Sequence, residues 1–224
     1  MSTTVTIIDY GIGNLLSVTR ALEHCGADVV LTDSPEVILR AERVLLPGVG
    51  AFADGMSGLS ERGPVGPLRA YAEGGRPLMG ICLGMQLLLE VSEEFGEHEG
   101  LGLIPGRVQA VPTVGIDGAP HKIPHIGWNH LVRPSNNTSW DGTVLEGLPE
   151  QPAFYFVHSF AVAPTYAEHR LADTSYNGRV ITAAVQRGLI YGCQFHPEKS
   201  GELGLQIIRN FIKLQVAQKP IAVA

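Results

Sequence analysis

Basic residues are scarce in this chain of 224 residues. Lys and Arg together number 16 against 22 Asp and Glu, which leaves a formal net charge of -6. No basic cluster offsets this excess of acidic residues. We therefore do not expect nucleic acid or an anionic membrane to be the main partner of the chain.

Long apolar runs and paired cysteines are also lacking. The longest apolar stretches have the length of a strand, far below the ~18 residues that cross a bilayer. Met1-Ser2-Thr3-Thr4 has neither the charged nor the apolar region of a signal peptide. Cys25, Cys82 and Cys193 are odd in number and widely spaced, which favours reduced thiols over a disulfide framework. These absences predict a cytoplasmic protein.

Motifs for nucleotides, phosphates and metals are incomplete or missing. Gly11-Ile12-Gly13 begins like a dinucleotide fingerprint, but Leu16 stands where the third glycine would be. The chain has no Gly-x-x-x-x-Gly-Lys-Ser/Thr phosphate loop. No cysteine or carboxylate cluster accompanies His121, His125 and His130, so surface or packing roles are favoured over metal ligation. We expect neither a cofactor nor a metal.

The pattern of apolar residues differs between the two halves of the chain. Up to residue 92, strands alternate with helices, as is typical of a parallel sheet covered on both faces. The expected strands are 5–9, 28–31, 43–46 and 77–81, and the expected helices are 14–25, a short one beginning at Ser34-Pro35-Glu36, and 83–92. From residue 106, strands separated by turns are expected at 107–111, 123–132, 154–162, 170–175, 180–186 and 189–195. Asn177-Gly178 predicts a hairpin turn, and Ser200 is expected to cap a final helix.

A candidate nucleophile lies in Gly80-Ile81-Cys82-Leu83-Gly84, between an expected strand and an expected helix. A side chain at such a bend is held on strained backbone, and the flanking glycines permit the close approach that the bend requires. The helix start favours a thiolate at Cys82 and places the Leu83 N–H to bind an oxyanion. The alternative is a buried cysteine beside two helix-capping glycines, and the motif alone leaves both interpretations open.

A candidate base and its orienting carboxylate lie in His196-Pro197-Glu198, near the other end of the chain. A thiol nucleophile needs a general base, and the base needs a third group that holds its tautomer. His196 follows an expected strand, and open α/β sheets place their chemistry at such strand ends. Alternation along this strand puts Gln194 beside His196 and turns Cys193 toward the core. His158 is a rival base, ranked second because no carboxylate is near it in sequence.

The two motifs together, at residues 80–86 and 196–198, resemble the signatures of class I glutamine amidotransferases with a Cys-His-Glu triad. Four further segments resemble the glutaminase subunits of imidazole glycerol phosphate synthases: residues 9–15 (DYGIGNL), 47–52 (PGVGAF), 124–129 (PHIGWN) and 195–200 (FHPEKS). The resemblance runs along essentially the whole chain. It implies a single domain of residues 1–224 with a flavodoxin-like three-layer α/β fold, in which a mostly parallel sheet gains antiparallel strands in the C-terminal half.

The resemblance also implies a role for each matching residue. The Cys82 thiolate would attack glutamine, His196 would transfer protons, and Glu198 would orient His196. The implied oxyanion hole consists of Leu83, Val49 and Gly50, and the implied glutamine contacts are Gly48, Gln86, Ser159 and Phe160. The family usually has Tyr at the position of Phe160, so a hydroxyl contact is missing there.

A partner is implied as well, because free ammonia protonates in water and the chain has no phosphate site for an acceptor. In the family this partner is a (βα)8-barrel cyclase subunit, which forms imidazole glycerol phosphate and an aminoimidazole-carboxamide ribonucleotide in histidine biosynthesis. We expect Asn14, Trp128 and Lys199 to face it, although Trp128 as a core anchor and Lys199 as a solvated lysine are alternatives.

Three other functions compete with this interpretation. The glutaminase of pyridoxal phosphate synthesis shares the triad but lacks the segments around Asn14 and Trp128 as they stand here. An α/β-hydrolase with a cysteine elbow would place its acid before the histidine, for example at Glu146 or Asp173. A noncatalytic subunit that keeps only the fold would not need an intact triad.

Overall fold

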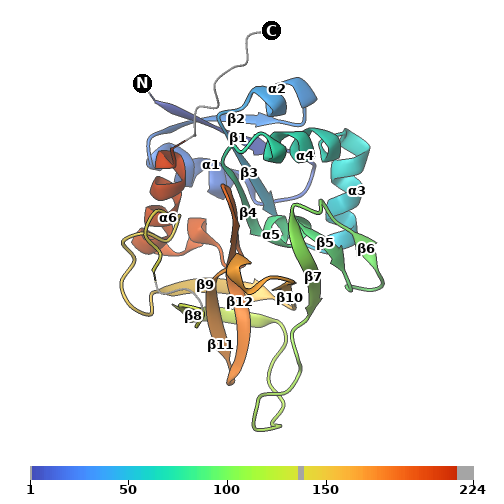
Figure 1. Ribbon diagram of the computed structural model, residues 1–224, viewed down its shortest axis with the longest axis vertical. Helices are drawn as coiled ribbons and strands as arrows, with labels where there is room; N and C mark the ends of the chain where they lie inside the picture. Colours follow the sequence, from blue (N-terminus) through green and yellow to red (C-terminus); the bar gives the residue numbers. More distant parts are fainter. Residues whose placement is uncertain (1, 136–138, 216–224) are drawn as a thin grey trace.

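The computed structural model describes residues 2–135 and 139–215. Within these residues one sheet has nine strands, in the order β2-β1-β3-β4-β13-β12-β11-β8-β9 (Figure 1). Parallel pairings join five of these strands: β1 (Thr3–Ile8), β2 (Ala27–Thr32), β3 (Arg43–Gly48), β4 (Leu78–Cys82) and β13 (Ile190–Cys193). The sheet continues with antiparallel pairings through β12 (Arg179–Arg187), β11 (Arg170–Tyr176), β8 (His125–Val132) and β9 (Ala153–His158). The expected fold class is therefore confirmed.

Helices cover both faces of the parallel part of the sheet. Alternate residues of the parallel strands enter two separate cores, because successive side chains of a strand point to opposite faces. On β3, for example, Leu45 joins one core and Leu46 the other. The first core also takes side chains of α1 (Leu15–His24) and α6 (Gly201–Lys213), and the second takes those of α2 (Pro35–Arg40), α3 (Phe52–Arg62), α4 (Val65–Glu73) and α5 (Leu83–Leu87).

A second, smaller sheet packs beside this layer. In the described part of the chain it has four strands: β10 (Phe160–Pro164), β7 (Ile104–Ala110), β5 (Leu89–Ser92) and β6 (His98–Glu99). Two short 3-10 helices, η1 (Ala167–His169) and η2 (Pro197–Lys199), complete the elements. The arrangement of the labelled helices and strands can be followed in Figure 1.

Several local predictions are confirmed by the structure. The helix expected over 14–25 is α1, at whose start the side chain of Asn14 accepts the N–H of Ser17, and Gly26 follows this helix with a φ of 87°. Asn177 and Gly178 have φ values of 47° and 78°, as the hairpin turn between β11 and β12 requires. These features depend on a few neighbouring residues, and the sequence therefore predicts them.

Two predicted elements are wrong in extent. The helix expected over 83–92 ends at Leu87, and β5 follows at once, pairing with β6 and β7. The strand expected over 154–162 breaks at Ser159 into β9 and β10, which belong to different sheets. In both cases pairing with strands distant in the sequence decides the backbone.

Ser200 does not cap α6 with its side chain, contrary to the prediction. Its hydroxyl accepts the N–H of Tyr155 at 3.0 Å and donates to the carbonyl of His196 at 2.7 Å. Ser200 thus connects β9, the segment of the candidate base and the start of α6.

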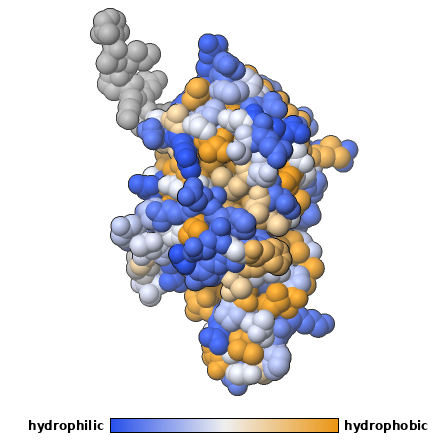
Figure 2. Space-filling model, turned by 90° about the vertical axis from the view of Figure 1, so that its right-hand side faces the viewer, coloured by the Kyte–Doolittle hydropathy of each residue, from blue (hydrophilic) through white to orange (hydrophobic). Residues whose placement is uncertain are grey.

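The described surface mixes polar and apolar residues. On the face in Figure 2, hydrophobic residues gather toward the lower end of the molecule, where the connection between β7 and β8 extends in Figure 1. Among the described residues, no helix combines the length and the apolar character needed to span a membrane.

Candidate active site

Cys82 occupies a strained bend between β4 and α5. Its φ of 54° and ψ of -111° lie outside the regions that non-glycine residues usually adopt. The predicted strained elbow is therefore present, and it turns the thiol into a pocket while only 7% of the residue stays exposed.

The two glycines beside the elbow are required by close backbone contacts. A Cβ on Gly84 would lie 1.8 Å from the carbonyl oxygen of Leu46, and one on Gly80 would lie 2.5 Å from that of Gly84. Real Cβ atoms do not come this close to backbone oxygens, so neither position has room for a side chain. These contacts hold the start of α5 against β3 and β4.

The structure brings Cys82, His196 and Glu198 together from opposite halves of the chain. β13 lies next to β4 in the sheet, so the segment after β13 reaches the end of β4. Nδ1 of His196 lies 2.7 Å from Oε1 of Glu198, and both side chains are buried. Nε2 of His196 has no hydrogen-bond partner among the described residues and remains available for proton transfer at the pocket wall.

Electrostatics make His196 a strong proton acceptor. Burial on its own would lower the pKa of the imidazole. Interactions with Cys82 and with the Glu198 carboxylate outweigh burial and raise the pKa of His196 to about 9. A raised pKa makes the imidazole better able to accept a proton from a thiol.

A cavity of about 430 Å³ opens above the thiol. Its walls contain residues from both halves of the chain: Val49, Gly50, Cys82, Leu83, Gln86, Glu94, Pro124, Val157, His158, Ser159, Phe160 and His196. This set includes every residue expected to bind glutamine or an oxyanion except Gly48. Gly48 lies beneath the cavity, where a Cβ would meet the hydroxyl of Tyr10 at 2.4 Å.

The segment expected to complete the oxyanion hole has one anchored and one free end. The buried Tyr10 hydroxyl donates to the carbonyl of Pro47 at 2.7 Å and fastens the end of β3. Gly50, by contrast, has a φ of 97° and no atom within 4 Å of its would-be Cβ, and Val49 is 41% exposed. The peptide between Val49 and Gly50 therefore has space to rotate.

Gln86 and Gln194 form a buried amide network beneath the nucleophile. Nε2 of Gln86 donates to the carbonyl of Phe160 at 3.1 Å and to Oε1 of Gln194 at 3.0 Å. Nε2 of Gln194 in turn lies 3.7 Å from Sγ of Cys82. Since both amide hydrogens of Gln86 are used in this network, only its oxygen can serve a ligand in the cavity.

His158 lines the same cavity but is unsuited to act as the base. Its Nδ1 lies 2.8 Å from the carbonyl oxygen of Phe160, and its Nε2 lies 2.9 Å from Nδ1 of His125. Burial lowers the pKa of His158 to about 3, and that of His125 to about 4. With both ring nitrogens occupied, His158 ranks behind His196 on geometry as well as on sequence.

Two polar residues of the site were not recognised from the sequence. Glu94 is buried at the cavity wall, where its carboxylate accepts the N–H of Phe52 at 2.7 Å. Gln194 was placed beside His196 by strand alternation but received no role, although its amide reaches Cys82. For Glu94 no motif gives a signal, because its position depends on the turn after β5.

The remaining acidic and thiol groups are occupied elsewhere. Asp173 pairs with Arg170 at 2.5 Å, and Glu146 accepts the N–H of Gly142, so the triad acid required by the hydrolase alternative is not supported at either position. Burial raises the pKa of Cys193, which lies fully inside the core as predicted. Among the described residues, no three potential metal ligands gather in one place.

The residues expected to face a partner lie outside the cavity. Trp128 is 61% exposed on β8, which excludes the core-anchor alternative. Lys199 is exposed at the end of η2, which packs against α1, the helix that Asn14 caps.

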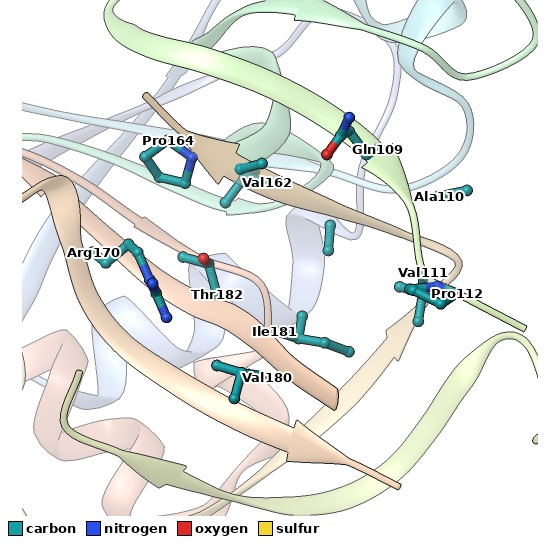
Figure 3. Close-up of a pocket in the computed structure, with 12 residues that line it drawn as sticks. Gln109, Ala110, Val111, Pro112, Val162, Pro164, Arg170, Val180, Ile181 and Thr182 are labelled. Carbon is teal, nitrogen blue, oxygen red and sulfur yellow. The ribbon is translucent and has the colours of Figure 1, made fainter. Parts of the chain in front are cut away.

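A second cavity, of about 360 Å³, lies between β7 and β10 on one side and β11 and β12 on the other (Figure 3). Small apolar side chains line most of it, and Gln109, Arg170 and Thr182 are its polar groups. Of the described residues in its walls, none carries a thiol, an imidazole or a carboxylate. Unlike the cavity above Cys82, this cavity therefore offers no nucleophile and no general base among its described residues.

Comparison with known proteins identifies the family of the chain. The family model of class I glutamine amidotransferases matches residues 6–214. The chain belongs to the class I glutamine amidotransferase family. It is 53% identical to the imidazole glycerol phosphate synthase subunit HisH 1 of Legionella pneumophila (strain Lens), over 94% of this chain and 99% of that protein. It is 47% identical to subunit HisH of Moorella thermoacetica, over 94% of each chain.

Solved structures support the fold. A crystal structure of a glutamine amidotransferase aligns with a TM-score of 0.69 at 18% identity, covering 93% of this chain and 97% of that one. The structure of PurLQS from Thermotoga maritima aligns with a TM-score of 0.68 at 19% identity, covering 95% of this chain and 98% of that one.

Proposed function

We propose that this chain is the glutaminase subunit of an imidazole glycerol phosphate synthase. It hydrolyses glutamine to glutamate and ammonia and passes the ammonia to a (βα)8-barrel cyclase subunit, which uses it in histidine biosynthesis. The observation that carries this proposal is the meeting of Cys82 with the buried His196 and Glu198 pair at one cavity. The identity to HisH subunits over nearly the whole chain supports the choice of partner and of acceptor reaction.

The proposed reaction begins with attack of the Cys82 thiolate on the side-chain carbonyl of glutamine. His196 donates a proton to the leaving ammonia as the C–N bond breaks, and a thioester remains. Water, deprotonated by His196, then hydrolyses the thioester and releases glutamate. Glu198 keeps the Nδ1 proton of His196 in place and stabilises the imidazolium through both steps.

The oxyanion of each tetrahedral intermediate is bound by backbone N–H groups. Leu83 is the first residue of α5, so no carbonyl within the helix accepts its N–H. The second donor comes from the segment of Val49 and Gly50 at the opposite wall of the cavity. This donor depends on how the peptide between Val49 and Gly50 is turned.

The cavity offers complementary groups for the amino-acid end of glutamine. The Gln86 oxygen and the buried Glu94 carboxylate are acceptors, and we assign them to the α-ammonium group. Ser159 and Phe160 lie at the break between β9 and β10, where backbone groups are placed to contact the α-carboxylate. Phe160 provides no hydroxyl, so its contribution is from the backbone and the ring.

The cyclase subunit is proposed to cover the surface around the cavity mouth that includes Asn14, Trp128 and Lys199. An exposed tryptophan is a frequent anchor of protein interfaces. Receiving ammonia directly prevents its protonation in water. We place the assembled enzyme in the cytoplasm, in keeping with the scarcity of disulfide-forming cysteines.

The division of labour between the subunits can be tested with Cys82→Ala. The assembled variant is expected to release no glutamate from glutamine but to form product from added ammonium salt at the parent rate. Cys193→Ala, which removes a buried thiol outside the site, serves as the control and should retain both activities. Loss of the ammonium-dependent activity in a folded, assembled Cys82→Ala complex would refute the proposal.

A further inference from the structure

A series of hydrogen bonds between neutral groups runs from the candidate active site to β8. His125 and His158 face each other across β8 and β9, and Nδ1 of His125 lies 2.9 Å from Nε2 of His158. Nδ2 of Asn129 lies 3.1 Å from the remaining nitrogen of His125, and it donates to the carbonyl of Ser175 at 2.8 Å. At the other end, Nδ1 of His158 meets the carbonyl of Phe160.

Donor and acceptor chemistry allows only one arrangement of protons in this series of hydrogen bonds. The Phe160 carbonyl is an acceptor, so Nδ1 of His158 carries the proton and its Nε2 accepts. Nδ1 of His125 must then be the donor to His158, which leaves Nε2 of His125 as the acceptor for Asn129. The orientation of Asn129 is fixed independently, because its Oδ1 accepts the N–H of His130 at 2.8 Å.

Packing holds the rings in this arrangement. The His125 ring stacks on Phe156, with centroids 4.9 Å apart, and contacts Tyr176 on another side at 4.2 Å. His125 and His158 are both buried, and burial disfavours a charge on either ring. A neutral His158 also leaves His196 as the only cationic ring beside the thiol among the residues that line the cavity.

The series of hydrogen bonds meets the amide network of the site at one atom, the carbonyl oxygen of Phe160. The Phe160 carbonyl accepts from both His158 and Gln86, and Gln86 is linked through Gln194 to Cys82. We propose that His158, His125 and Asn129 are positioning residues, held as two neutral Nδ1–H imidazoles and an amide, that fix the Phe160 carbonyl and thereby the Gln86 side chain. The consequence for glutamine binding rests on the proposed function, whereas the tautomers do not.

The tautomers can be measured without any assay of activity. Long-range 1H–15N correlation spectra of the isolated, 15N-labelled chain at neutral pH are expected to show His125 and His158 as neutral rings protonated at Nδ1. Signals are assigned by their loss in His125→Gln and His158→Gln. An Nε2–H or an imidazolium pattern for either ring in the parent protein would overturn the proposal.

Asn129 permits a sharper test because it lies outside the cavity. Asn129→Asp keeps the size of the side chain but faces Nε2 of His125 with an acceptor, so the His125 signature should change to that of an imidazolium. Asn129→Leu removes the donor altogether. His130→Ala, on the neighbouring exposed position, is the matched control and should leave both ring signatures unchanged.

The effect on function is read from glutamate release by the assembled complex. Asn129→Leu is expected to raise KM for glutamine by about 3- to 10-fold while kcat stays within about 2-fold, since the change acts on the position of Gln86 and not on the triad. An unchanged KM in a folded Asn129→Leu complex would overturn the positioning role. Failure of the parent complex to release glutamate would instead refute the proposed function, and the spectra would still decide on the tautomers.

Discussion

Nδ1 of His196 lies 2.7 Å from Oε1 of Glu198, and only 3% and 1% of the two side chains are exposed. Residues two apart in sequence meet this way because η2 turns the chain directly after His196. A carboxylate so well shielded from water interacts strongly with the imidazole. Together with the interaction with Cys82, this contact raises the pKa of His196 despite its burial.

Replacing Glu198 should alter the pH dependence of stability. Because the folded pKa of His196, about 9, exceeds the ordinary value of 6.5, the imidazolium stabilises the fold below pH 6.5, and this stabilisation is lost as pH rises to about 9. Glu198→Gln removes the carboxylate and lowers the folded pKa, so Tm should fall less across this range than in the parent. Equal pH profiles of Tm would contradict the assignment.

Glutamine hydrolysis should suffer less in Glu198→Gln than in His196→Ala, for which a loss of about 100-fold or more is expected.

Glu94→Gln should weaken glutamine binding. The amide keeps an acceptor for the N–H of Phe52 but no longer offers a negative charge to the α-ammonium group. Loss of a charged hydrogen bond predicts a rise in KM of about 10- to 100-fold, with a smaller change in kcat. Glu93→Gln, whose carboxylate pairs with Arg107 on the surface, is the control. A KM that does not distinguish the two variants would exclude Glu94 from the site.

Two glycines should respond in opposite ways to the same substitution. Gly84→Ala forces a methyl group against the carbonyl of Leu46 and should destabilise the protein by at least about 3 kcal/mol. Gly66→Ala, in α4 with nothing within 4 Å of the added Cβ, should stabilise it by about 0.5 kcal/mol. Denaturant unfolding measures both values. A folded Gly84→Ala variant of parent stability would show that the elbow does not need this contact.

Gly50→Pro should abolish the activation of glutamine hydrolysis by the partner subunit. Proline has no N–H and holds φ near -65°, so it cannot adopt the φ of 97° found at Gly50 or present the residue-50 donor. We expect the isolated parent chain to hydrolyse glutamine slowly and the assembled, nucleotide-bound complex to be faster by about 100- to 1000-fold, the effect of one oxyanion donor. Gly50→Pro should assemble normally without this activation. Rapid hydrolysis by the lone parent chain, or full activation of the variant, would rule out the switch.

Charge reversal at Lys199 should weaken assembly without unfolding the chain. Lys199 is exposed directly after Glu198, on the segment that joins the triad to the proposed interface. Lys199→Glu should therefore raise the Kd of the complex or reduce product formed per glutamine hydrolysed. Lys213→Glu, at the far end of α6, introduces the same charge change as a control. If Lys199→Glu and Lys213→Glu couple hydrolysis to synthesis equally well, Lys199 has no interface role.

Much of the site follows from local sequence, because its main features depend on backbone within a few residues. Gly80 and Gly84 around Cys82 predict the strained elbow, and His196 is predicted at the end of a strand, as Cys82 is. Glu198 reaches His196 across a single turn. Such short-range relationships predict a candidate nucleophile, base and acid without a structure, whereas the pairing of β4 with β13 that brings them together is seen only in the structure.

Other features depended on which distant segments pack together. Leu89–Ser92 is a strand and not the end of a helix because β6 and β7 pair with it, and no residue within the segment signals those partners. Glu94 enters the cavity for the same reason.

By itself, then, the sequence determined the alternating α/β pattern, the elbow at Cys82 and the pairing of His196 with Glu198, since local conformation suffices for each. Only the tertiary structure decided that His158 is neutral, because His125 and the Phe160 carbonyl occupy its two nitrogens from other strands. It also decided that Trp128 is exposed and that Gln86 can offer only its oxygen to a ligand. Hydrogen bonds between distant strands and the exposure of a single side chain such as Trp128 are properties of the packed chain, which periodicity along the sequence does not fix.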